Sequence, residues 1–165
     1  KLMNRKHTIK DYQEIIYKLK EVRSDICFSS DFIVGFPGET EADFEETLRL
    51  CENIEFSQAY SFNYSSRPGT TASSREEVEE TQKKERLFRL QNLLETKQNA
   101  FLSKQVGKTV KVLFEKKGKD PNEYIGRSDY FYPVSVQSKH EIIGKIRNVK
   151  VELCLKHSVK GSLLG

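Results

Sequence analysis

The stretch SSDFIVGFPGETEADFEET, residues 29–47, sets a strand, a tight turn and a helix start directly after one another. Apolar side chains alternate with polar ones along residues 26–34, which predicts a strand. Gly35, Pro37 and Gly38 then fix a turn, because proline restricts φ and glycine tolerates positive φ. A threonine and an aspartate follow at the spacing of a helix-starting capping box. This order predicts a parallel β/α layer.

The neighbouring segments extend this pattern. Thr8 and Asp11 have the same capping-box spacing ahead of a helical periodicity, and residues 58–64 predict a second strand that ends in an Arg-Pro-Gly-Thr turn. Ligand sites in parallel β/α folds form where strands end and lead into helices. We therefore expect a binding site at the turn 33–39, with a purely structural βα turn as the alternative.

Two further segments differ from this layer. Residues 75–103 contain no glycine or proline and consist mostly of good helix formers, which predicts one long helix lying against the layer. From Val106 onward the apolar spacing changes to two. Short strands with glycines at their bends predict a five-stranded β-barrel there.

The charge is divided unequally between the two halves of the chain. Residues 1–103 hold 15 Lys and Arg against 18 Asp and Glu, whereas residues 104–165 hold 13 against 6. A balance of −3 followed by one of +7 indicates two modules, of which the basic one faces a polyanion such as RNA. The alternative is a solubilising lysine surface on a barrel whose aromatic residues are core.

The cysteines and the apolar runs limit the function classes. Cys27, Cys51 and Cys154 are odd in number and far apart, so they predict neither a disulfide framework nor a metal site. We expect them to be small core residues in a reducing, cytoplasmic setting. No apolar run approaches the ~18 residues of a membrane span, so no membrane partner is expected.

Several stretches together resemble one known family. DFIVGFPGETEADFEET and YSFNYSSRPGTTAS are similar to the late barrel strands of radical S-adenosylmethionine (SAM) methylthiotransferases, and KLMNRKHTIKDY is similar to the segment just upstream. The basic half, from GRSDYFYPVSV to GSLLG, is similar to their TRAM domain, a small antiparallel barrel that binds RNA. SSRPGT and the final SLLG most resemble the tRNA-modifying MiaB type.

The resemblance implies an architecture with boundaries. Residues 1–72 would be the C-terminal part of a radical SAM β/α barrel, residues 73–102 a connecting amphipathic helix packed on it, and residues 103–165 a TRAM RNA-binding barrel. The expected fold class is thus α/β, a partial parallel β/α barrel, followed by a small all-β antiparallel barrel of OB-like kind. The missing N-terminal part of the same enzyme is then an expected partner.

The resemblance also implies cofactors. The family binds S-adenosylmethionine and two [4Fe–4S] clusters, one of them on a CxxxCxxC motif that this chain lacks, so we expect no metal ligand here and no activity of the chain alone. Two of the expected contacts have a structural alternative. Arg5 could be an exposed loop arginine without a ligand, and Asp31 could form a buried salt bridge. No catalytic residue is singled out. The expected contacts to S-adenosylmethionine are Arg5, Asp31, Ile33, Gly35, Phe36, Gly38, Glu39 and Arg67.

The basic half is expected to contact the anticodon stem-loop of tRNA. The full enzyme implied by the resemblance adds a methylthio group to carbon 2 of N6-isopentenyladenosine beside the anticodon. One alternative is a related enzyme that acts on threonylcarbamoyladenosine or on a ribosomal protein. Another is a non-catalytic RNA-binding protein whose β/α half is a scaffold. The expected RNA contacts are Lys111, Lys116, Lys117, Arg127, Tyr130, Lys145 and Arg147.

Overall fold

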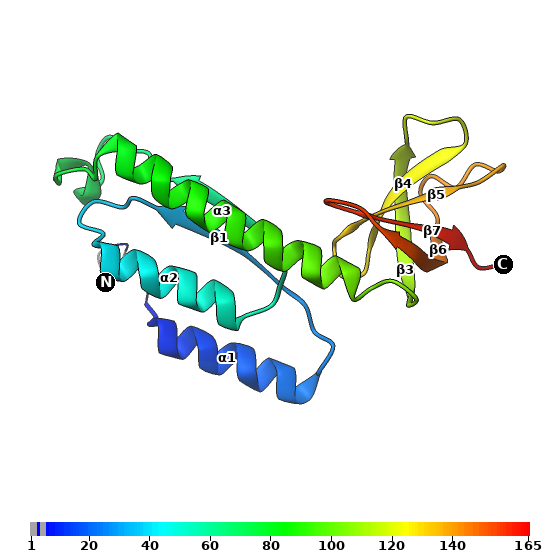
Figure 1. Ribbon diagram of the computed structural model, residues 1–165, viewed down its shortest axis with the longest axis horizontal. Helices are drawn as coiled ribbons and strands as arrows, with labels where there is room; N and C mark the ends of the chain where they lie inside the picture. Colours follow the sequence, from blue (N-terminus) through cyan, green and yellow to red (C-terminus); the bar gives the residue numbers. More distant parts are fainter. Residues whose placement is uncertain (1–2, 4–5) are drawn as a thin grey trace. The chain divides into compact units, whose positions relative to one another are not determined.

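A computed structural model describes residue 3 and residues 6–165 (Figure 1). The chain divides into two compact units, one formed by the residues up to Ile54 with Ala59–Leu94, the other by Glu55–Gln58 with Glu95–Gly165. One unbroken helix, α3, continues from the first unit into the second. The first elements are α1 (Ile9–Val22), β1 (Phe28–Val34), α2 (Glu41–Asn53), β2 (Phe56–Asn63), the 3-10 turn η1 (Thr71–Ser74) and α3 (Glu80–Ser103).

The first unit is built on β1 and β2, which form a two-stranded parallel sheet joined through α2. The predicted alternation along β1 is confirmed, because Phe32 and Val34 are buried whereas Asp31 and Ile33 are exposed on the other face. The sheet therefore has one covered face, and its opposite face is open among the described residues.

Both predicted capping boxes are present. In α2 the Thr40 hydroxyl donates to Asp43 Oδ2 at 2.6 Å, and the N–H of Asp43 donates back to Thr40 Oγ1 at 3.2 Å. Thr8 and Asp11 make the same pair of contacts at the start of α1. These caps satisfy backbone donors that a helix start leaves open, so the local sequence fixes where both helices begin.

α3 begins later than its composition predicts, at Glu80 rather than at residue 75. Residues 76–79 form no regular structure, and the Glu77 carboxylate accepts a hydrogen bond from Lys83 Nζ at 2.6 Å. Helix propensity alone therefore overestimated the length of the helix.

The second unit is a closed five-stranded barrel, as predicted, in the spatial order β3-β4-β5-β7-β6. The expectation that every pair is antiparallel is wrong at one place, where β5 and β7 run parallel. A closed ring with an odd number of strands cannot alternate direction throughout, so one pair has to be parallel. The strands are β3 (Thr109–Lys117), β4 (Glu123–Ser128), β5 (Pro133–Gln137), β6 (Ile146–Cys154) and β7 (Val159–Leu163).

Valines fill the interior of the barrel. Val112, Val134, Val136 and Val149 are fully buried. The sequence neighbours of Val112 and Val149 are exposed, as the two-residue period of a strand requires, whereas Ser135 between the two β5 valines is buried as well. Among the described residues, no helix combines the length and the apolar character that crossing a membrane would need.

Candidate functional site

The turn after β1 has a backbone shape that favours glycine. Gly35 has φ of 73° and Gly38 has φ of 85°, in the left-handed region. A Cβ added at Gly35 would lie 2.5 Å from Cγ of Lys83, whose side chain is buried. Gly35 is therefore required both for its φ and for the close approach of α3.

Glu39 fastens this turn from within. Its Oε2 accepts hydrogen bonds from the backbone N–H of Gly35 at 2.8 Å and of Phe36 at 3.3 Å. Its Oε1 accepts from Arg86 Nη1 at 3.1 Å. Both carboxylate oxygens of Glu39 thus accept hydrogen bonds from within the chain, and these bonds fix the shape of the turn.

Arg86 is the buried group that connects α3 to this turn. Its side chain is 6% exposed, and Nη1 also donates to the backbone carbonyl of Glu39 at 3.1 Å. A second carboxylate, on Glu41, lies 3.3 Å from its Nε and Nη2. No local pattern marks this contact, since Arg86 and Glu39 stand 47 residues apart.

The neighbouring helix α2 is held in the same way. Arg89 of α3 pairs with Glu41 at 2.6 Å and with Glu45, and its guanidinium lies 4.9 Å from the centroid of the Phe44 ring. The hydrogen bond from Arg89 holds the pKa of the Glu41 carboxyl below its usual value. The start of α2, the second and third turns of α3 and the turn after β1 are therefore connected by these ion pairs.

The C-terminal ends of β1 and β2, with the turns that follow them, form what we call the rim (residues 33–39 and 63–70). A cavity of about 850 Å³ opens there, lined by Ile33, Phe36, Tyr64, Arg67 and other residues of both turns. The Phe36 and Tyr64 rings meet edge to face with centroids 5.1 Å apart. The volume lies within the range of about 300–1,000 Å³ that small-molecule sites occupy.

A second cavity, of about 570 Å³, lies between the turn and the starts of α1 and α2. Gly38 and Glu39 line it, together with Tyr12 and Asp43, whereas Ile33 and Phe36 line both cavities. The structure thus brings most of the predicted cofactor residues to the two cavities of one rim.

The other predicted cofactor residues do not line these cavities in the described part of the chain, and Gly35, at the turn itself, is one of them. Asp31 is exposed on the open face of the sheet, lines neither cavity and makes no ion pair within the part of the chain that the structure describes, so the buried salt bridge is not found. Arg5 lies outside the described residues. Arg67 is exposed at the rim, and among residues 3 and 6–165 it forms no ion pair.

The residues present can be tested against the expected cofactors. Among the described residues, the rim offers two aromatic rings, an aliphatic side chain and a guanidinium without an ion pair at one cavity, which fit an adenosyl group and a carboxylate. Iron–sulfur clusters do not fit the described residues. No disulfide joins Cys27, Cys51 and Cys154, of which Cys51 is buried and the other two are half-buried, and no described group of three or more His, Cys, Asp or Glu could hold a metal.

On the barrel, strand register places two of the predicted RNA contacts together. Arg127 of β4 lies directly across from Leu113 of β3, and Lys111 lies two residues along on the same exposed face. Leu113 and Ile146, which pair with each other, leave 43% and 62% of their surfaces exposed between these cations. Arg127 is 3.6 Å from Glu115 in an exposed ion pair, an arrangement that contributes little to stability.

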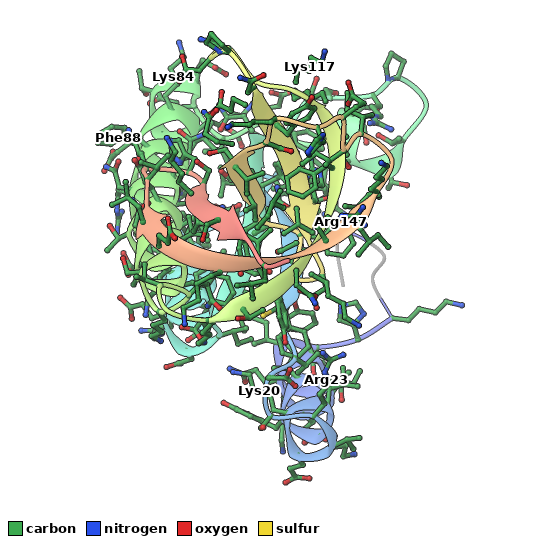
Figure 2. The ribbon with its side chains drawn as sticks, turned by 90° about the vertical axis from the view of Figure 1, so that its right-hand side faces the viewer. Lys20, Arg23, Lys84, Phe88, Lys117 and Arg147 are labelled. Atoms are coloured by element: carbon green, nitrogen blue, oxygen red, sulfur yellow. The ribbon has the colours of Figure 1, made fainter. Side chains whose placement is uncertain are left out.

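The other predicted contacts are spread around the barrel. Figure 2 shows Lys117 and Arg147 at well-separated positions of this unit. Lys117 lies 3.6 Å from Glu141, and Arg147 sits across from the interior residue Val112 at an exposed end of β6. Lys116 and Lys145 are exposed, and Tyr130 is half-buried. The seven residues therefore mark the barrel as basic without forming one compact group.

Comparisons with known proteins agree with this division. Residues 1–51 match the Radical SAM superfamily and residues 103–164 match the TRAM domain. A protein of Wolbachia pipientis wMel named tRNA-2-methylthio-N(6)-dimethylallyladenosine synthase is 51% identical over 162 residues, which are 96% of this chain and 37% of that protein. Proteins of the same name from Jannaschia sp. (strain CCS1) and Ehrlichia chaffeensis (strain ATCC CRL-10679 / Arkansas) are 46% and 47% identical over 165 residues, covering 99% and 98% of this chain.

The chain spans 36% of the Jannaschia protein and 37% of the Ehrlichia protein. Two family matches in this order, together with near-complete coverage of the chain by relatives that are about half identical, agree with the expectation from the sequence motifs. The chain therefore belongs to the radical SAM methylthiotransferase family, MiaB type, and corresponds to a little over a third of the length of its curated relatives.

Proposed function

We propose that this chain is the part of a tRNA methylthiotransferase that contributes one side of the S-adenosylmethionine site and the tRNA-binding barrel. The observation that carries the proposal is the joint match of both units, radical SAM first and TRAM second, to relatives named for tRNA-2-methylthio-N(6)-dimethylallyladenosine synthesis. The substrate is then N6-isopentenyladenosine beside the anticodon, in a cytoplasmic enzyme whose boundaries in this chain are 1–72, 73–102 and 103–165.

At the rim, the residues have separate roles. Ile33, Phe36 and Tyr64 supply apolar surface for the adenine and ribose, and the exposed guanidinium of Arg67 meets the carboxylate of the methionyl group. Glu39 and Arg86 hold the turn and leave the cavity open for the ligand. S-adenosylmethionine supplies the radical chemistry when it is bound beside an iron–sulfur cluster, whose ligands we assign to the remainder of the enzyme.

On the barrel, cations and exposed apolar groups serve tRNA. The excess of 13 basic over 6 acidic residues in 104–165 gives the electrostatic attraction, and side chains such as Lys111 and Arg127 reach phosphates. The competing proposal is an RNA-binding protein with an inert β/α scaffold. The large rim cavity and its ion-paired support favour the enzyme, because a scaffold has no need of either.

A titration of a tRNA anticodon stem-loop into the 165-residue chain at several salt concentrations tests the RNA contribution. With about four to six phosphate contacts, the slope of log affinity against log salt is expected to be about −3 to −5. Lys111→Ala should make this slope shallower by about one. A folded chain without salt-dependent binding would contradict the assignment of the barrel to tRNA.

A further inference from the structure

The loop between β4 and β5 contains a phenylalanine in an unusual backbone conformation. Phe131 has φ of 68°, in the left-handed region that bulky side chains rarely adopt. Its side chain is also 65% exposed and makes no ring contact within the described residues. Strained conformations of this kind persist where the surrounding structure enforces them, and they gather at functional sites.

The surrounding structure does enforce this conformation. Ser128 N–H donates to the carbonyl of Tyr132 at 3.0 Å, and Phe131 N–H donates to the carbonyl of Ser128 at 2.9 Å. Tyr132 is buried, with its ring 6.0 Å from that of Phe101, and it anchors the far side of the loop. The loop therefore directs the Tyr132 ring into the core of the barrel and holds the Phe131 ring outward in solvent.

The loop is also tied to the cationic side of the barrel. Asp129 N–H donates to the carbonyl of Lys111 at 3.0 Å, and Arg127 is the last residue but one of β4 before the loop. Phe131 is thus a fixed aromatic side chain on a hairpin that carries Arg127 and is hydrogen-bonded to the strand that carries Lys111. Aromatic residues among cations are the combination with which proteins hold unpaired bases, since the cations attract phosphates and the ring stacks on the base.

We propose that Phe131 is a base-stacking residue for an unpaired nucleotide of the tRNA anticodon loop. The inference rests on the proposed tRNA-binding role of the barrel and assigns base stacking to one particular aromatic residue of it. Because the ring is already held outward, little side-chain and loop ordering opposes stacking when RNA binds. The left-handed φ closes the three-residue β4–β5 hairpin, and the exposed ring that this hairpin holds outward is free to take the stacking role.

Phe131→Ala and Phe131→Gly in the 165-residue chain test the proposal, with a tRNA anticodon stem-loop as the probe. Both variants should bind about 5- to 100-fold more weakly than the parent chain, as expected for loss of one stacked base. The salt slope should stay unchanged, because no phosphate contact is lost. Phe131→Tyr should retain most of the affinity.

The glycine variant separates function from structure. Glycine tolerates positive φ, so Phe131→Gly should raise the melting temperature by about 2 °C or more while it weakens RNA binding. Phe88 on α3 is a matched control: it is 64% exposed, projects outward in Figure 2 and lies in ordinary helix. Phe88→Gly should lower the melting temperature by about 1–2 °C and leave RNA affinity unchanged.

The outcomes distinguish the two levels of inference. If the parent chain shows no salt-dependent binding, the assignment of the barrel to tRNA fails. If the parent chain binds and Phe131→Ala binds equally well, the stacking role is overturned. The exposed ring would then be a contact for a protein partner instead of RNA. If Phe131→Gly loses both stability and affinity, the ring is structural and the proposal also fails.

Discussion

Arg86 and Glu39 form a nearly buried ion pair, 3.1 Å between Nη1 and Oε1, that fixes the turn after β1 from a helix 47 residues further along the chain. The other carboxylate oxygen of Glu39 accepts hydrogen bonds from the N–H groups of Gly35 and Phe36, so the ion pair also restrains the backbone of the turn. The shape of the rim is therefore determined by α3 as well as by the turn itself.

Removing Arg86 should destabilise the chain strongly. Arg86→Ala leaves the Glu39 carboxylate without its cation in a mostly buried place, which should lower the free energy of unfolding by about 2–4 kcal/mol. Arg89→Ala removes a guanidinium that is 35% exposed and should cost about 1 kcal/mol. Urea unfolding of both variants measures the difference. Equal losses would show that the buried pair has no special role.

Substitutions at Gly35 and Gly69 separate two free-energy costs of adding a Cβ, that of the left-handed backbone and that of steric crowding. Gly69 has φ of 81° and open space where a Cβ would lie, so Gly69→Ala should cost only the left-handed backbone energy, about 1–2 kcal/mol. Gly35→Ala meets the same backbone cost and also places Cβ against the stem of Lys83, so its loss should exceed that of Gly69→Ala by about 1 kcal/mol or more. Thermal unfolding of the two variants gives the comparison, and similar losses would mean that Lys83 moves aside freely.

The capping boxes make stability depend on pH. The hydrogen bond from the Thr40 hydroxyl, followed by that from the Thr40 N–H, lowers the pKa of Asp43 in the folded chain. A lowered carboxyl pKa stabilises the fold above the unfolded value of about 3.9, and the stabilisation is lost as the pH falls from there through the folded pKa. Asp43→Asn should therefore flatten the fall in melting temperature below about pH 4 relative to the parent chain. Identical profiles for parent and Asp43→Asn would contradict this.

The open face of the sheet should make the first unit self-associate. Ile33, Tyr60 and Phe62 leave 42%, 48% and 53% of their surfaces exposed there, and a two-stranded sheet has two edges that can pair. We expect sedimentation of the isolated chain to show dimers or larger species, and Phe62→Asp to reduce them more than Phe88→Asp does. A parent chain that stays monomeric at high concentration would count against this expectation.

Local signals predicted most of the secondary structure. The Thr8–Asp11 and Thr40–Asp43 boxes mark helix starts within four residues of sequence, and the two-residue period after Val106 predicted a five-stranded barrel. Geometry supplied what these signals do not contain. The parallel β5–β7 pair follows from closing a barrel with an odd number of strands, and this closure cannot be predicted from the sequence of any one strand.

The site was predictable only where neighbouring residues form it. The turn 33–39 is visible in the sequence, whereas Arg86 and Lys83 reach it from α3 and carry no local mark. The sequence shows that Phe131 is an aromatic residue among cations, but its left-handed φ was not predictable, since phenylalanine rarely adopts positive φ. Part of α1 also differs from its pattern, because Ile16 is buried while Ile15 and Val22 remain 56% and 88% exposed.

The most direct test of the account is a chimeric enzyme. Residues 1–165 replace the matching stretch of the Wolbachia pipientis wMel relative, to which 96% of this chain aligns at 51% identity. The readout is mass spectrometry of nucleosides from tRNA that carries N6-isopentenyladenosine, with the intact relative and the 165-residue chain alone as positive and negative controls. The account predicts that the chimera forms the 2-methylthio nucleoside and that the chain alone does not. A chimera that loads its iron–sulfur clusters and binds tRNA but forms no methylthio product would contradict it.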